Sequence, residues 1–176
     1  MSIDIIKECA NHYGDIQKLV ELAFRDEPYS DHKEHYLVDR IRKSSAYIPE
    51  LTLVAIESAS DTVVGFIMLS SISIGESDHK SLALAPVAVL PSHQAEGIGS
   101  SLIMEAHTRA SAMGFDSIVL LGHSEYYPRF GYKQLSSFGI SLPFDVPQEY
   151  AMAIELKEGS LRSVTGMVKY SSPFFE

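Results

Sequence analysis

Cysteine and basic residues are scarce in this chain of 176 residues. Its one cysteine, Cys9, excludes an intrachain disulfide framework and a thiolate-rich metal site. Lys and Arg number 14 against 23 Asp and Glu, which leaves a net charge of −9. That charge disfavours binding to nucleic acid or to an anionic membrane surface, whereas small cations and basic peptides remain compatible partners.

Long hydrophobic runs are missing as well. The longest, residues 82–90, contains Pro86 and is far shorter than the roughly 20 residues of a membrane-spanning helix. The first residues lack the basic region and apolar core of a signal peptide. We therefore expect a cytoplasmic protein without membrane association.

The length fits one domain, because a chain of this size buries a core without disulfides, and no repeat or linker-like stretch divides it. We expect residues 1–50 to form a strand and two helices, 51–135 a core, and 136–176 a set of C-terminal strands. Hydrophobic periodicity predicts the elements. Strands are expected over 2–8, 51–56, 62–74, 81–89, 117–121, 151–156 and 163–170, with one more beginning near 132, and helical segments over 15–24, 31–41, 97–113 and 124–129.

Local signals refine these elements. Asp31 and Glu34 have the spacing of a capping box for the second helix, and Tyr36 is expected on its apolar face. Met113 ends the apolar stripe of the third helix, which Gly114 would cap. Cys9 is expected to be a small buried residue on the first strand. Together the elements predict a mixed α/β sheet with helices on its faces.

The most informative stretch, residues 86–102, is a buried strand followed by a turn and a long helix. Gln94, Gly97 and Gly99 mark the turn. Amides in the first turn of a helix lack internal partners and lie at its positive end, so this turn suits a phosphate or pyrophosphate. The third glycine of a dinucleotide fingerprint and the lysine of a Walker A loop are both missing. Two glycines alone would also fit an ordinary strand-to-helix turn.

Two motifs in order resemble the GNAT N-acetyltransferase superfamily. Gln94-x-x-Gly97-x-Gly99 is similar to its Gln/Arg-x-x-Gly-x-Gly/Ala signature, and residues 127–132, Tyr-Pro-Arg-Phe-Gly-Tyr, are similar to its Tyr-x-x-x-Gly-Phe ending. Residues 125–132 and 140–147 further resemble the bacterial YhbS-like branch. The resemblance implies an α/β fold of GNAT type, with a mixed, mostly antiparallel central sheet, helices on both faces and a C-terminal strand extension.

The resemblance also implies an acetyltransferase that moves the acetyl group of acetyl-CoA to a primary amine by direct attack. Residues 1–50 would then lie on the acceptor side, and 51–135 would bind acetyl-CoA. Tyr127 matches the general acid, with Tyr126 as the alternative, and the Val89 amide would donate to the thioester oxygen. The implied contacts to the cofactor are the backbone of Val87, Ala88 and Val89 for the pantetheine, Gln94 at the entrance of the loop, and the amides of Ala95, Glu96, Gly97, Ile98, Gly99 and Ser100 for the pyrophosphate.

Several alternatives stay open at this point. The general base is not evident; the acids nearest the implied acceptor side are Asp26, Glu27, Asp31 and Glu34. The acceptor would be a small-molecule or peptide amine, and a homodimer is compatible with the sequence. No metal is expected, because the histidines are scattered and the pair His32 and His35 lacks a third ligand. A CoA-binding sensor without turnover and an unrelated nucleotide-binding protein are the competing hypotheses.

Overall fold

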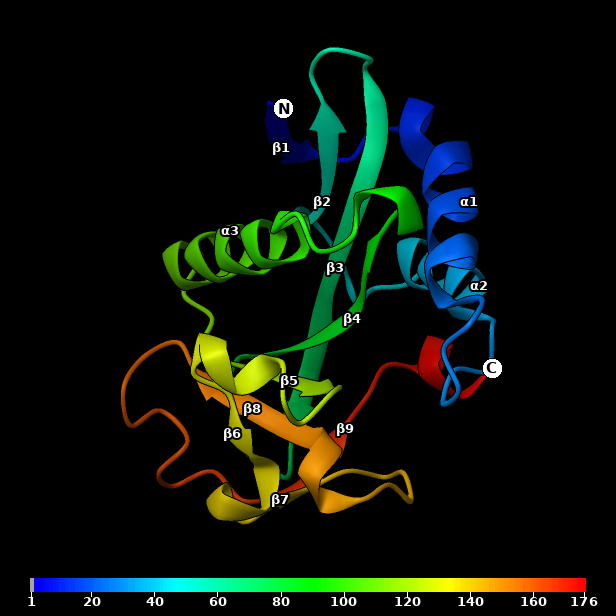
Figure 1. Ribbon diagram of the computed structural model, residues 1–176. Helices are drawn as coiled ribbons and strands as arrows, with labels where there is room; N and C mark the ends of the chain where they lie inside the picture. The colour runs from blue at the N-terminus through cyan, green and yellow to red at the C-terminus, as the bar shows by residue number, and fades with distance from the viewer. Residues whose placement is uncertain (1) are drawn as a thin grey trace. The chain divides into compact units, whose positions relative to one another are not determined.

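A computed structural model describes residues 2–176, in which helices and strands are mixed along the chain (Figure 1). The helices are α1 (Tyr13–Phe24), α2 (Glu34–Arg42) and α3 (Ile98–Ala112). The strands are β1 (Ile3–Lys7), β2 (Tyr47–Glu57), β3 (Thr62–Ile74), β4 (Ser81–Val89), β5 (Ser117–Leu121), β6 (Lys133–Gln134), β7 (Ile140–Ser141), β8 (Ala151–Glu155) and β9 (Gly166–Lys169). Every helix within these residues is too short or too polar to cross a membrane.

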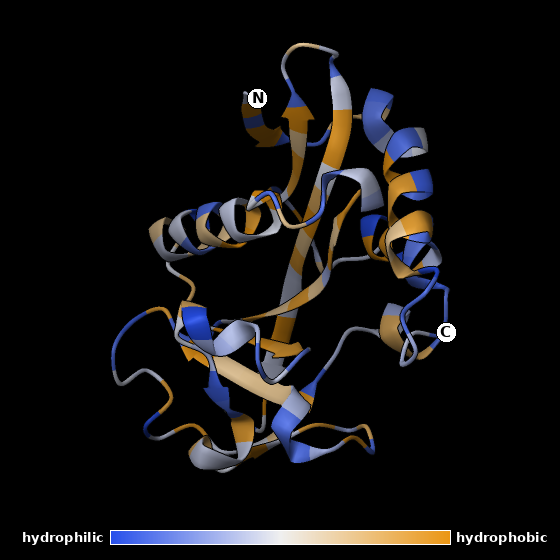
Figure 2. Ribbon diagram, in the orientation of Figure 1, coloured by the Kyte–Doolittle hydropathy of each residue, from blue (hydrophilic) through white to orange (hydrophobic). Residues whose placement is uncertain are grey.

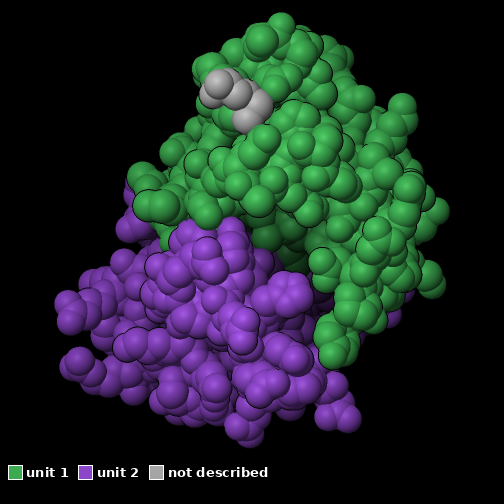
Figure 3. Space-filling model, in the orientation of Figure 1, with its two compact units in different colours: residues 1–69, 85–109 green, residues 70–84, 110–176 purple. Residues whose placement is uncertain are grey.

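The chain forms two compact units, which Figure 3 distinguishes by colour. Unit 1 comprises the chain up to Leu69 together with Ala85–Arg109, and unit 2 comprises Ser70–Leu84 and Ala110–Glu176. Strands β3 and β4 each contribute residues to both units.

In unit 1 the strand order is β1-β2-β3-β4, and β1 pairs with β2 antiparallel. Most of β2 and β3 is buried on both faces, and these strands are largely hydrophobic in Figure 2. Such runs require a cover on each face of the sheet. Figure 1 shows α3 and the pair α1 and α2 on opposite sides of β3. Gly65 permits the close approach of α3, because a Cβ there would lie 2.9 Å from a methyl group of Leu102.

The start of α2 differs from the predicted capping box. The helix begins at Glu34, and its N-cap residue, Lys33, makes no side-chain capping bond. Asp31 instead accepts a hydrogen bond from the Lys33 amide at 2.9 Å, and the Glu34 carboxylate accepts one from the Ser30 hydroxyl. The prediction was wrong because short polar side chains bonded locally within the preceding turn, which competes with capping.

The buried face of α2 also differs from the prediction. Tyr36 is 53% exposed, whereas His35 is 7% exposed and shares the buried face with Val38 and Ile41. These three residues are spaced by three positions, as one helix face requires. The apolar residues Val38 and Ile41 therefore determined the orientation of the helix, and the polar His35 is buried on the same face.

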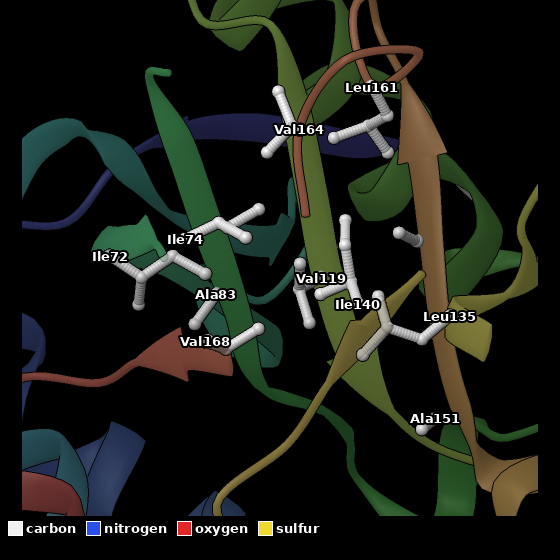
Figure 4. Close-up of a cluster of buried hydrophobic side chains, with 11 residues drawn as sticks. Ile72, Ile74, Ala83, Val119, Leu135, Ile140, Ala151, Leu161, Val164 and Val168 are labelled. Atoms are coloured by element: carbon white, nitrogen blue, oxygen red, sulfur yellow. The ribbon is translucent and has the colours of Figure 1, made fainter. Parts of the chain in front are cut away.

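Unit 2 has the strand order β3-β4-β5-β8-β6, and β9 pairs with β3 and with β7. The β4–β5 pair is parallel and joins residues 81–83 to 117–119, while the β5–β8 and β6–β8 pairs are antiparallel. The sheet is thus mixed and mostly antiparallel, with strands added from the C-terminal part, as predicted. Its core is a cluster of aliphatic side chains drawn in Figure 4 and contributed by β3, β4, β5, β8, β9 and the segments between them.

Two further expectations need correction. Cys9 lies after β1 and is exposed, because β1 ends at Lys7 and the chain turns into a short 3-10 helix. Met113 lies beyond the end of α3 and is 42% exposed, since Gly114 adopts a left-handed conformation with φ of 88° and ends the helix before it. The role of Gly114 as a helix cap is confirmed.

Candidate active site

The turn from β4 into α3 has an unusual backbone. Ala95 and Gly97 have φ angles of 64° and 84°, both in the left-handed region. Glycine adopts that region freely, whereas an L-residue such as Ala95 is strained by about 1–2 kcal/mol. No atom lies within 4 Å of the place where a Cβ on Gly97 would stand. The glycine is therefore required by the backbone conformation and not by crowding.

This conformation leaves a set of amides open to a ligand. The first bond inside the helix runs from the Ser101 amide to the Gly97 carbonyl at 3.0 Å, so the amides of Ile98 and Gly99 come before the helix's own hydrogen bonds begin. Left-handed residues in a turn direct successive amides toward one concave side, which favours an anion. Residues 94–97 are exposed, while the Ile98 side chain is buried and anchors the helix start. The turn can therefore bind a phosphate group through its main chain.

The end of β4 presents backbone groups on a second edge. The Leu90 amide donates to the Val64 carbonyl at 2.9 Å, so Leu90 faces β3. Backbone groups alternate between the two edges of a strand, and Val89 and Val87 therefore direct theirs away from β3, whereas Ala88 directs its own toward it. The pairing of β4 with β5 covers residues 81–83. Strand β4 extends beyond this pairing to Val89.

Gln94 links the turn to this strand end. Its side-chain Nε2 donates a hydrogen bond to the Val89 carbonyl at 3.2 Å. The glutamine thus folds back over β4 and holds the start of the loop, while its neighbours Ala95 and Glu96 stay exposed. Gln94, Val89 and the loop amides accordingly lie together within unit 1.

Tyr127 lies in unit 2, at the start of a 3-10 helix over Tyr127–Phe130. Its side chain is 7% exposed and packs edge-on against the rings of Tyr126 and Tyr132, with centroids 5.1 Å and 5.8 Å away. Burial, and secondarily the neighbouring Tyr126, raises the pKa of Tyr127 above its usual value, so the phenol stays protonated and able to donate.

Gly122 lies against the Tyr127 ring, a contact that the sequence analysis did not predict. A Cβ at this position would lie 2.2 Å from Cε2 of the Tyr127 ring, so only glycine leaves room for the ring as placed. The glycine directly follows β5, five positions before the tyrosine. That spacing is the only signal in the sequence, and it does not reveal the contact.

The acids expected on the acceptor side occupy the segment between α1 and α2 and the first turn of α2. Asp26 and Asp31 are exposed, and Glu27 and Glu34 are half-buried. Burial raises the pKa of Glu34, although the hydrogen bond from Ser30 opposes that shift. His123, which follows Gly122, is exposed.

Comparison with known proteins now identifies what this chain is similar to. Residues 16–132 match the acetyltransferase (GNAT) family. The chain is 29% identical to the uncharacterized N-acetyltransferase YjhQ of Escherichia coli K12, with 80% of each chain covered. It is 25% identical to the uncharacterized N-acetyltransferase YhbS of the same strain, over 64% of this chain and 67% of YhbS.

Solved structures agree with these relatives. The crystal structure of YhbS from Escherichia coli in complex with CoA superimposes with a TM-score of 0.89 at 22% identity, covering 99% of this chain and 92% of YhbS. The structure of a GNAT family acetyltransferase from Brucella melitensis in complex with acetyl-CoA has a TM-score of 0.81 at 32% identity, covering 98% of both chains. These likenesses support the YhbS-like branch suggested by the sequence.

Proposed function

The chain belongs to the GNAT family of acetyltransferases, and from that premise we propose that it transfers the acetyl group of acetyl-CoA to a primary amine by direct attack. The observation that carries this proposal is the loop of exposed amides between β4 and α3. Within the chain, residues 1–50 would serve the acceptor, 51–135 would bind acetyl-CoA, and 136–176 would complete the sheet.

Acetyl-CoA would bind mainly through the main chain. The backbone groups of Val87 and Val89 face the edge of β4 away from β3, where pantetheine amides could pair with them like an added strand. Ala88 lies between these two residues; its side chain is small and buried, and its backbone groups face β3. The amides of Ala95, Glu96, Gly97, Ile98, Gly99 and Ser100 would receive the pyrophosphate. Gln94, through its bond to Val89, would hold the loop in place.

The reaction requires a neutral amine, whose nitrogen attacks the thioester carbonyl carbon. The C–N bond forms, the C–S bond breaks, and one proton passes in total from nitrogen to sulfur. The Val89 amide would stabilise the negative charge that develops on the carbonyl oxygen. Direct attack forms no acyl-enzyme, so a stable acetylated intermediate of the protein would contradict this mechanism.

Tyr127 is the general acid in this proposal, with its hydroxyl group directed to the departing sulfur. A thiol has a pKa of about 8.5 and tyrosine one of about 10, and burial raises the tyrosine value further. Complete proton transfer to the thiolate is therefore uphill, and the main contribution of Tyr127 is a hydrogen bond that strengthens as charge builds on sulfur. Tyr126 would be the substitute if the Tyr127 hydroxyl proved dispensable.

The acceptor would be a small-molecule or peptide amine. The acids Asp26, Glu27, Asp31 and Glu34 and the net charge of −9 favour the approach of a cation. These four carboxylates are also the candidates for the general base that takes up the proton of the acceptor's ammonium form.

Titration calorimetry with acetyl-CoA, with ATP as the control ligand, tests the cofactor loop. Gly97→Ala should weaken binding of acetyl-CoA by about tenfold or more, because alanine is strained at this φ angle and alters the amide directions. Gly114→Ala is the matched control: its φ angle is 88° and its Cβ also meets nothing within 4 Å, so it carries the same strain outside the loop. Equal losses in both variants, or equal affinity for ATP, would refute the loop assignment.

Tyr127→Phe tests the chemistry separately. The variant should retain its affinity for acetyl-CoA and lose about 10²-fold or more in turnover, measured as thiol release with an amine that the wild type acetylates. Unchanged turnover would remove Tyr127 from the mechanism. Binding of acetyl-CoA without acetylation of any tested amine would instead favour a CoA-binding sensor.

A further inference from the structure

A cavity of about 270 Å³ lies between α1 and α2, within unit 1. These two helices are neighbours in Figure 1. Tyr13, Gly14 and Gln17 of α1 and His35, Tyr36 and Asp39 of α2 are among its walls. Gly14 opens the wall, because nothing lies within 4 Å of the place where its Cβ would stand. The volume is just below the range of about 300–1,000 Å³ that is typical of sites for drug-sized ligands, so it suits a smaller molecule.

One buried group in the cavity wall lacks a partner. His35 is 7% exposed, and among the described residues its Nδ1 atom has no hydrogen bond. A buried polar atom without a partner destabilises the fold, so such atoms are rare unless a water or a ligand satisfies them. The unpaired nitrogen therefore indicates an occupant that can form hydrogen bonds.

The charged group in the cavity wall that is free to pair with such an occupant is an acid, Asp39. Arg42 also borders the cavity, but its Nε and Nη2 atoms donate to the buried Glu8 carboxylate at 2.8 Å and 2.7 Å. Asp39 pairs with Lys43 at 2.9 Å, and the two side chains are 55% and 75% exposed. An exposed ion pair of this kind contributes little to stability, so a ligand can replace the lysine readily. The arginine charge is thus neutralised within the protein, whereas the aspartate charge is exchangeable.

His35 and Asp39 are four residues apart on α2 and therefore share one helix face, with Cβ atoms about 5–6 Å apart. An ammonium group has three N–H donors and no acceptor, so one such group can pair with a carboxylate and an imidazole nitrogen together. The Arg42 guanidinium already lies over the Tyr13 ring, 3.9 Å from its centroid, so Tyr36 supplies the aromatic surface for a ligand, and aromatic faces attract cations. Oxygen acceptors, an imidazole acceptor and aromatic faces are the groups that recognise an organic cation.

We propose that the cavity between α1 and α2 binds a small protonated amine, with its ammonium group on Asp39 and His35 and its carbon skeleton against the ring of Tyr36. The proposal does not depend on the transfer reaction, since it concerns binding alone. An acceptor for acetylation and a regulatory amine would be recognised by the same chemistry, and kinetics distinguishes these two roles.

Phenethylamine is a suitable probe, because it combines one ammonium group with one aromatic ring, and 2-phenylethanol is its uncharged counterpart. We expect calorimetry to show saturable binding of the amine and at least about tenfold weaker binding of the alcohol. Asp39→Asn should weaken amine binding by a similar factor. Glu105→Gln is the matched control, because Glu105 forms an equivalent pair, at 2.8 Å and four residues apart, with Arg109 on α3.

Gly14→Leu tests the cavity itself. Leucine favours helix, and the open space at this position lets its side chain enter the cavity without displacing the backbone. We expect this variant to keep or raise the melting temperature of the wild type, because a helix-forming residue replaces glycine, and to lose amine binding. No saturable binding at millimolar phenethylamine, equal affinity for the alcohol, or undiminished binding in both Asp39→Asn and Gly14→Leu would overturn the proposal.

The same variants separate this inference from the proposed function. Loss of acetyl-CoA binding by the wild type would refute the transferase proposal and leave amine binding as measured. If Gly14→Leu loses both amine binding and amine-dependent thiol release, the bound amine is the acceptor. If it loses binding while thiol release with phenethylamine continues, the amine at this site is a regulator. Either result supports the cavity as an amine site.

Discussion

The contact between Gly122 and Tyr127 gives the sharpest test of the proposed chemistry. In Gly122→Ala the new Cβ would stand 2.2 Å from Cε2, 2.7 Å from Cδ2 and 3.2 Å from Cζ of the ring. Carbon atoms pack at about 3.5–4.0 Å, so the ring and the backbone must separate by more than about 1 Å. The ring is 7% exposed and bounded by Tyr126 and Tyr132, which leaves it little room to move without repacking.

Two consequences follow from that displacement. Overpacking of a close contact destabilises a protein by about 1–3 kcal/mol, which urea unfolding measures. A misplacement of about 1 Å in a reacting group lowers the rate by about 10²-fold, so kcat for thiol release should fall by that factor. The affinity for acetyl-CoA should stay as in the wild type, because the three atoms nearest to a Cβ at Gly122 all belong to Tyr127 and none to the cofactor loop.

A double variant shows whether the effect passes through the Tyr127 hydroxyl. Once Tyr127→Phe has removed that group, adding Gly122→Ala should lower kcat little further, because residues that act as one unit are not additive. The reasoning is refuted if Gly122→Ala retains turnover within about threefold of the wild type while losing the expected stability. It is equally refuted if the two substitutions lower kcat independently.

Glu8→Gln leaves the guanidinium of Arg42, which is 9% exposed, without its carboxylate, and urea unfolding should show a loss of about 3–5 kcal/mol. Burial lowers the pKa of His107 to about 4 in the folded protein, whereas the value in the unfolded chain is about 6.5. Below pH 6.5 the unfolded chain takes up a proton that the folded protein does not bind, so the folded state loses stability as the pH falls. The free energy of unfolding should therefore fall by about 2–3 kcal/mol between pH 6.5 and 4, and His107→Gln should flatten that slope. Gly65→Ala should destabilise the protein by about 1–3 kcal/mol, because the new Cβ would lie 2.9 Å from a methyl group of α3. Gly14→Ala should stabilise it by about 0.5–1 kcal/mol, because Gly14 lies in a helix and its Cβ would meet open space. The opposite order of melting temperatures would contradict both predictions.

Much of the fold could be predicted from hydrophobic periodicity. The strands at 62–74, 81–89 and 117–121 have the bounds expected from their apolar runs, and Gly114 ends α3 as its position suggests. The second helix was predicted less well: its cap and its buried face differ because neighbouring side chains compete for the same turn and because Val38 and Ile41 orient the helix. Tertiary packing decides such competition, and a local sequence pattern holds no information about that packing.

The candidate site divides in the same way. The residue order Gln94-x-x-Gly97-x-Gly99 determined where a strand meets a helix, because that property depends on adjacent residues, whereas the left-handed backbone at Ala95 was not predicted from it. Only the tertiary structure decided that Gln94 bonds the end of β4, that Gly122 lies against Tyr127, and that His35 lines a cavity. Those contacts join separate segments at distances of a few ångströms. Their geometry follows from how the chain closes on itself, which no local spacing encodes.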